Sequence, residues 1–185
     1  MPFDDSDMKI AGDAFEPAKE ADDAEATALL LAREKKNGNL SRARRLGAIM
    51  AEEVSAIEGD SRAQDAATLT QRRILLAFAV EVGLDAFLPD TLLAQTAQSV
   101  FYETLRQTAS AFYEDLQESG AFSFYYLCVR EGRQVENKVG ETYASLCGRA
   151  GDPEVAAEGA RLYVHFIEQV KAFTDRMDFV RDSAI

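Results

Sequence analysis

Residues 152–180 read DPEVAAEGARLYVHFIEQVKAFTDRMDFV, and this stretch decides the fold. Asp152 is a good N-terminal helix cap, Pro153 fits the first helical position, and Glu154 favours the positive end of the helix dipole. The stretch therefore predicts one long core-facing helix of ~25 residues. Its apolar residues recur at steps of three and four, the spacing of one helix face: Val155, Gly159, Leu162, Phe166, Val170, Phe173, Met177 and Val180.

The same spacing fills most of the chain upstream of this stretch, between stop signals such as Gly59 and Pro89. Residues 74–80 are apolar nearly all round, so the helix that contains them is expected at the centre of the bundle. Asp90 is expected to cap a single long helix that reaches about residue 118. The expected helices cover residues 20–36, 40–58, 60–87, 90–118, 121–129 and 134–147, followed by the long last helix.

Residues 121–129 have the one composition that is typical of a strand, AFSFYYLCV. A strand needs a partner, and nothing else in the chain offers one. We therefore expect a short buried helix with Phe122, Tyr125, Tyr126 and Val129 facing inward. The fold class predicted for the whole chain is all-α, an antiparallel helical bundle of about six to seven helices with no β-sheet.

The domain organisation follows from length and composition. The chain has 185 residues, of which 47% are apolar and 28% charged, so it fits one hydrophobic core. Residues 1–19 hold too few apolar side chains for a stable helix face and are expected to form an acidic, mobile N-terminal arm. Residues 20–185 are expected to form a single helical-bundle domain. Residues 20–36 begin with acids and end with bases, an order that favours a helix in that direction.

Charge and hydropathy limit the partners and the compartment. The net charge of −12 disfavours nucleic acid, whose affinity for proteins comes from Lys and Arg. The longest apolar runs, 74–80 and 122–129, are far shorter than the ~20 residues of a membrane-spanning helix. Residues 1–13 are acidic where a secretory signal needs a basic lead. We expect a cytoplasmic protein of bacterial type with no membrane partner and no cofactor, and with Cys128 and Cys147 as buried thiols.

Two charged groups are candidate sites. His165 and Glu168 lie one helical turn apart and could share a metal ion, although one histidine cannot supply the paired motifs of a di-iron bundle. The ordinary alternative is an ion pair at the edge of the core. Arg42, Arg44 and Arg45 form a basic cluster that could bind an anion or phosphate. A solvated face neutralised by the acids upstream explains the same residues.

The third candidate is a ligand pocket in the tyrosine-rich region 122–143. Tyr125, Tyr126 and Tyr143 could orient a small molecule through their hydroxyl groups, with Arg130 or Arg133 for an anionic group. Core packing is the more frequent use of such aromatic residues.

No catalytic residue is predicted, since the chain has a single histidine and no GxSxG elbow or phosphate loop. The function expected first is a non-catalytic protein-interaction or scaffold module, with self-association or a protein partner and an exposed apolar patch on one helix face. The alternative is a small-ligand-binding bundle that uses region 122–143. A metal-dependent enzyme centred on His165 and Glu168 comes last.

Overall fold

The computed structural model describes residues 17–57 and 66–181, with side chains from residue 24 onward. In these ranges the chain is all-helical, with eight helices and no strand, so the predicted fold class is confirmed. The helices are α1 (Pro17–Lys36), α2 (Asn39–Ala56), α3 (Ala66–Phe87), α4 (Thr91–Thr108), α5 (Ser110–Glu118), α6 (Ala121–Glu131), α7 (Val135–Leu146) and α8 (Pro153–Arg176).

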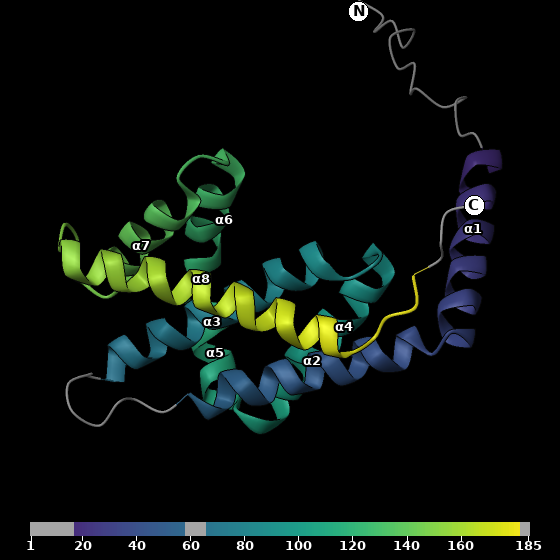
Figure 1. Ribbon diagram of the computed structural model, residues 1–185, viewed down its shortest axis with the longest axis horizontal. Coiled ribbons are helices and arrows are strands. Elements are labelled where there is room, and N and C mark those ends of the chain that lie inside the picture. Colours follow the sequence, from purple (N-terminus) through teal and green to yellow (C-terminus); the bar gives the residue numbers. More distant parts are fainter. Residues whose placement is uncertain (1–16, 58–65, 182–185) are drawn as a thin grey trace, which may run out of the picture.

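Three helix pairs make the closest associations: α7 with α8, α2 with α4, and α3 with α8. Helix α2 runs in the opposite direction to α3, whereas α8 lies beside α3 and runs the same way (Figure 1). Helices α6 and α7 form one end of the molecule, and α1 stands at the other end (Figure 1). The end formed by α6 and α7 therefore lies far from α1 (Figure 1).

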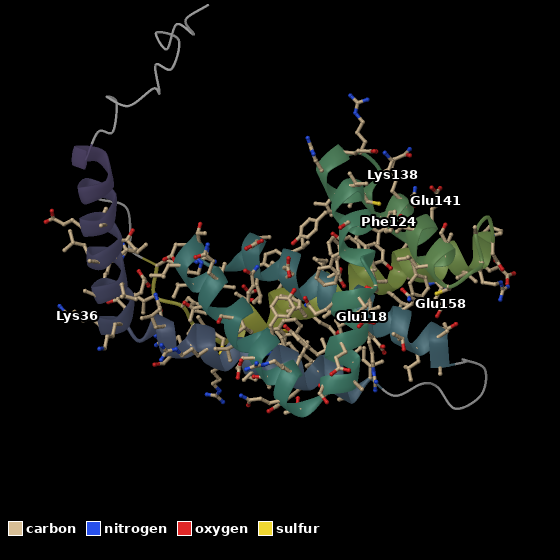
Figure 2. All side chains as sticks on the ribbon, turned by 180° about the vertical axis from the view of Figure 1, so that it is seen from behind. Lys36, Glu118, Phe124, Lys138, Glu141 and Glu158 are labelled. Carbon is tan, nitrogen blue, oxygen red and sulfur yellow. The ribbon has the colours of Figure 1, made fainter. Side chains whose placement is uncertain are left out.

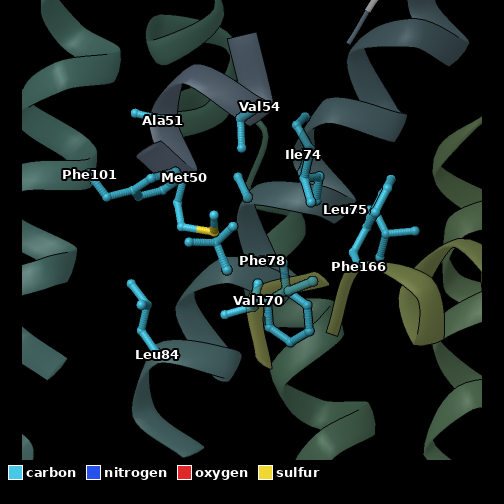
Figure 3. Packing of buried hydrophobic residues seen from close by; sticks show 14 of the residues in the cluster. Met50, Ala51, Val54, Ile74, Leu75, Phe78, Leu84, Phe101, Phe166 and Val170 are labelled. Atoms are coloured by element: carbon cyan, nitrogen blue, oxygen red, sulfur yellow. The ribbon is translucent and has the colours of Figure 1, made fainter. Parts of the chain in front are cut away.

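Helix α3 occupies the centre, as the sequence predicts. Its residues 74–80 are all buried, so every side of this helix is covered. Figure 3 shows Phe78 and Ile74 of α3 surrounded by Met50 of α2 and by Phe166 and Val170 of α8. Burial of large apolar side chains is the main stabilising term in a bundle of this kind.

Two glycines set the distance between the closest helices. A Cβ atom at Gly47 of α2 would lie 2.2 Å from the carbonyl oxygen of Ala97 in α4. A Cβ atom at Gly140 of α7 would lie 2.2 Å from the carbonyl oxygen of Ala156 in α8. Neither distance is possible for a real side chain, so each pair of backbones can approach this closely only because the residue is glycine.

Two of the predicted helix starts, at Asp90 and Asp152, are confirmed by their capping bonds, whereas the start predicted at residue 60 lies outside the described residues. The Asp90 carboxylate accepts a hydrogen bond of 2.9 Å from the backbone N–H of Leu93. The Asp152 carboxylate accepts from the backbone N–H groups of Glu154 and Val155, at 3.0 and 3.3 Å. Helix α8 is 24 residues long and begins at Pro153, close to the predicted length.

The single helix predicted over residues 90–118 is wrong. Ala109, with φ −143° and ψ 53°, leaves the helical conformation and separates α4 from α5. Beyond the break, Phe112 and Leu116 of α5 pack into the core, each 6% exposed. Ala109 lies between Thr108 and Ser110, so no glycine or proline marks this break in the sequence.

The prediction that Val180 lies on the core-facing side of the last helix is also wrong. Val180 lies beyond the end of α8 and is 44% exposed. Its backbone is held by the buried Asn39 side chain, which donates to the Val180 carbonyl at 2.8 Å and accepts from the Val180 N–H at 3.0 Å. The same Asn39 amide donates to the buried Glu34 carboxylate at 2.6 Å. These bonds tie the C-terminal segment to the junction of α1 and α2.

The domain prediction is only partly covered by the structure. Residues 1–16 of the expected arm lie outside the described residues, and α1 already begins at Pro17. A single domain over 20–185 remains a prediction. Among the described helices, none combines the length and the apolar character needed to cross a bilayer.

Candidate protein-binding face

Residues 121–129, whose composition is typical of a strand, form a helix, α6, as predicted. It lies between Gly120 and Gly132, whose φ values of +61° and +66° are left-handed and end the helix on both sides. One side of α6 faces the core, where Ala121 and Tyr125 are fully buried and Cys128 is 8% exposed. The packing of this side fixes the direction in which the remaining side chains of α6 point.

The flank of α6 next to Cys128 carries apolar residues that face solvent. Phe124 is 55% exposed and Leu127 is 56% exposed. They are three residues apart on a helix, so their side chains are neighbours. We call these two residues the α6 patch. Apolar residues on both sides of a surface helix leave one side without a packing partner in the bundle.

A hollow of about 390 Å³ adjoins the α6 patch. It is lined by Phe124 of α6 and by Glu141, Thr142, Ser145 and Leu146 of α7. Figure 2 shows Phe124 close to Glu141 and Lys138 at this end of the molecule. An apolar wall opposite polar rim groups is the usual composition of a protein-binding surface.

Charged residues surround the α6 patch. Lys138 pairs with Glu131 at the end of α6, and Arg130 and Arg133 are exposed beside them. The Cys128 thiol lies 3.3 Å from the Thr142 hydroxyl, which links α6 to α7 beneath the hollow. The α6 patch therefore rests on a fixed base and has a polar rim.

Tyr126 faces inward only in part: its ring lies 5.2 Å from the buried Phe78 ring, but the residue is 39% exposed. Its hydroxyl donates to the Glu81 carboxylate of α3, and the Tyr102 hydroxyl of α4 donates to the other oxygen of the same carboxylate. Burial raises the pKa of Tyr102, and the Glu81 carboxylate raises it further. Burial and Glu81 raise the pKa of Tyr126 as well. One carboxylate thus joins three helices and fixes one flank of α6.

The five residues of the predicted ligand site lie in different surroundings. Tyr125 and Tyr143 are fully buried, so a ligand would have to displace packed side chains to reach them. The Tyr125 ring lies 5.1 Å from the Phe78 ring, and burial raises the pKa of both tyrosines. Arg130 and Arg133 are exposed, and Tyr126 is bound to Glu81. These positions favour a core role for Tyr125 and Tyr143.

A second hollow, of about 650 Å³, lies between α7 and the start of α8. Part of the predicted ligand region lines it, but through Gln134, Asn137 and Glu141 rather than through the tyrosines. Its floor is formed by alanines that include Ala144 and Ala156. Gln134 has a left-handed backbone with φ +51°, which is uncommon for a residue with a side chain.

The three arginines of the predicted anion patch make different contacts. Arg42 is half-buried and donates to the Asn37 carbonyl at 2.7 Å and to the Asn39 side chain at 3.3 Å, so it serves the turn between α1 and α2. Arg44 and Arg45 are exposed on α2. The three guanidinium groups therefore have different environments, and anion binding stays a prediction.

His165 and Glu168 are both exposed on α8. Within the described ranges, no group of three or more His, Cys, Asp or Glu side chains is placed to hold a metal ion. The metal hypothesis consequently gains no support from the arrangement of these residues, and it stays untested.

Comparison with known proteins adds no further information about this site. No protein-family model, no curated protein and no solved structure matches the chain. The geometry of the described residues is therefore the basis for a functional proposal.

The residues of the α6 patch were not singled out from the sequence, although a signal for them was present. Inward positions predicted for Phe122 and Tyr125 leave Phe124 and Leu127 on the other side of the same helix. Because all of them are apolar, sequence spacing alone does not say which side is covered.

Proposed function

We propose that the protein is a non-catalytic interaction module that binds a protein partner through the α6 patch. The observation that carries this proposal is the exposure of Phe124 and Leu127 on a helix whose other side is packed in the core. Leaving two large apolar side chains in water forgoes the stabilisation that their burial provides. A partner that covers these two side chains gains that stabilisation as binding energy.

The occupant that fits is a protein segment with an apolar anchor side chain. The hollow beside Phe124 ends at Leu146, so an anchor inserted between α6 and α7 would contact apolar groups on both sides. Glu141, which lines the hollow, can form hydrogen bonds or an ion pair with a flank of the segment. Central apolar anchors with a polar rim supply most of the affinity in such interfaces.

We also propose that the protein is cytoplasmic. Cys128 and Cys147 are not joined in a disulfide, as is usual for proteins of a reducing environment. We therefore place the protein in the cytoplasm. The net charge of −12 supports partners that are neutral or basic at their contact surface.

A photo-crosslinking amino acid tests where the partner binds. p-Benzoylphenylalanine replaces Phe124 in one variant and Gln117, an exposed residue of α5, in the control. We expect a specific crosslinked protein with the first variant and none with the second. Equal crosslinking from both positions, or crosslinking from neither, contradicts the proposal.

Binding measurements with the crosslinked partner then test the residues. Phe124→Ser combined with Leu127→Ser should weaken binding about 10-fold or more, since both side chains are anchors. Gln117→Ser is the matched control and should bind as the unchanged chain does. Both positions are exposed, so circular dichroism should show unchanged helix content. Unchanged affinity of the double variant would show that the partner binds elsewhere.

A further inference from the structure

Helix α1 is a long helix with little contact to the rest of the molecule. It covers 20 residues, about 30 Å at 1.5 Å per residue, and stands at the edge of the bundle (Figure 1). Among the side chains of residues 24–36, Glu34 is the one that is buried. Leu29 is 66% exposed and Leu31 is 45% exposed. Helices in proteins gain most of their stability from packing of an apolar face, and α1 has little of it within the bundle.

One side of α1 carries a row of exposed apolar residues. Ala24, Ala28 and Ala32 follow one another at four-residue steps and are all exposed, so they form one row along the helix. Leu31 and Leu29 flank this row on its two sides. Small side chains let a second helix approach closely, and flanking leucines can then pack around it. We call these five residues the α1 face.

The charges of α1 indicate which helix can pack on this face. In sequence, residues 17–26 carry one lysine and four acids, a net charge of −3. Residues 27–36 carry three bases and one acid, a net charge of +2. A second copy of α1 placed antiparallel brings the acidic half of each helix beside the basic half of the other. Parallel pairing would place like charges together, which is unfavourable.

We infer that the α1 face binds the α1 face of a second copy of this chain, as an antiparallel, two-fold symmetric helix pair. Such an interface is self-complementary, because each contact occurs twice. Burial of the alanine row and the two leucines stabilises the pair, and the opposed charges fix its direction. This inference is independent of the proposed function: Lys36 of α1 and Phe124 of the α6 patch lie at opposite ends of the molecule (Figure 2).

Charge reversal in the full-length protein tests the pairing. Sedimentation equilibrium should give twice the 20.4 kDa chain mass for the unchanged protein, with a dissociation constant that rises with salt. Lys35→Glu combined with Lys36→Glu places acids opposite acids and should raise the dissociation constant about 10-fold or more. Glu20→Lys combined with Glu25→Lys should do the same. A mixture of the two variants should form a one-to-one heterodimer.

The control carries the same change of charge at the other end of the molecule, as Arg130→Glu combined with Arg133→Glu. It should dimerise as the unchanged chain does. Hydrogen exchange provides a second readout: amides of residues 24–32 should lose protection when the dimer is diluted or charge-reversed, and amides of residues 74–80 should not. This comparison separates loss of pairing from unfolding.

Three results would overturn the inference. The first is a monomer mass for the unchanged chain at about 1 mM. The second is a dimer whose dissociation constant does not respond to charge reversal in α1. The third is crosslinking between copies through position 124, which would place the self-contact on α6. A partner bound to the α6 patch of a dimeric chain would leave both proposals standing, whereas loss of that partner alone would contradict only the proposed function.

Discussion

Helices α1 and α3 have similar lengths, 20 and 22 residues, and opposite environments. Helix α3 is covered on every side along residues 74–80, whereas the α1 side chains from residue 24 onward are mostly exposed. Both are helical, but for different reasons. Burial of apolar side chains holds α3, while acids at the start and bases at the end of α1 stabilise it locally through the helix dipole.

The comparison shows that helix formation and contribution to stability are separate properties. A helix with good local signals can form at the edge of a bundle and bury almost nothing. A helix with an apolar surface all round cannot exist outside a core. Substitutions in α1 and α3 should consequently differ in cost, and the following predictions test and refine that difference.

The largest effect is expected at Phe78, which is fully buried at the centre of α3. Phe78→Ala should lower the free energy of unfolding by about 3–5 kcal/mol, because the variant loses apolar burial and leaves a cavity. Leu29→Ala in α1 should change it by less than about 0.5 kcal/mol at a concentration where the chain is monomeric. Urea denaturation measures both. Similar losses at the two positions would mean that α1 contributes to the core of the monomer.

The next effect concerns Asn39, which joins the end of α1 to the C-terminal segment. Asn39→Ala removes one of the two partners of the buried Glu34 carboxylate, which keeps Arg33, and the side-chain partner of the Val180 backbone; it should cost about 2–3 kcal/mol. The Val180 amide should also lose protection from hydrogen exchange. Asn137→Ala, at an exposed position, is the control and should cost less than about 0.5 kcal/mol. Retained protection at Val180 would contradict the proposed role of Asn39.

A smaller effect is expected where α2 and α4 touch. Gly47→Ala should cost about 1–3 kcal/mol, because the added Cβ atom meets the Ala97 carbonyl and the helices must separate. The sign is informative, since alanine in place of glycine stabilises an isolated helix by about 1 kcal/mol. Ser99→Ala on the exposed side of α4 is the control. A gain in melting temperature for Gly47→Ala would show that the close approach is not required.

The smallest effect is expected at the N-terminus of α8. Backbone N–H donation, first from Val155, and the Arg149 guanidinium lower the pKa of the Asp152 carboxyl in the folded state. Ionised Asp152 therefore stabilises the folded protein above the unfolded pKa of about 3.9, and this contribution is lost as the pH falls through the lower folded value.

Asp152→Asn keeps the capping group and removes the charge. Its melting temperature should be below that of the unchanged chain at neutral pH, and the two should converge in acid. In the Arg149→Gln background the difference at neutral pH should be smaller. A difference that grows as the pH falls would contradict the assigned direction of the shift.

Several features of the fold could be predicted because they depend on neighbours in sequence. The caps at Asp90 and Asp152 need only the residues that follow them. The central place of α3 followed from an apolar surface that only a core can cover. The break at Ala109 could not be predicted, because no glycine or proline marks it; beyond it Phe112 and Leu116 are buried in the core.

The candidate site was predicted less well than the fold. The sequence predicted a site in the region of α6, but it placed that site at the tyrosines rather than at Phe124 and Leu127. Tyr125 is used in the core and Tyr126 binds Glu81, which lies 45 residues earlier in the chain. Such long-range contacts leave no periodic signal in the sequence.

The sequence by itself determined that the chain is helical, where most helices begin, and which helix lies at the centre, since spacing, capping and hydropathy are local properties. Tertiary structure decided which side of α6 stays exposed, where the helix predicted over 90–118 divides, and how closely α2 approaches α4. Those outcomes depend on which surfaces the folded chain brings together, and helices with apolar residues on more than one side can be packed in several ways.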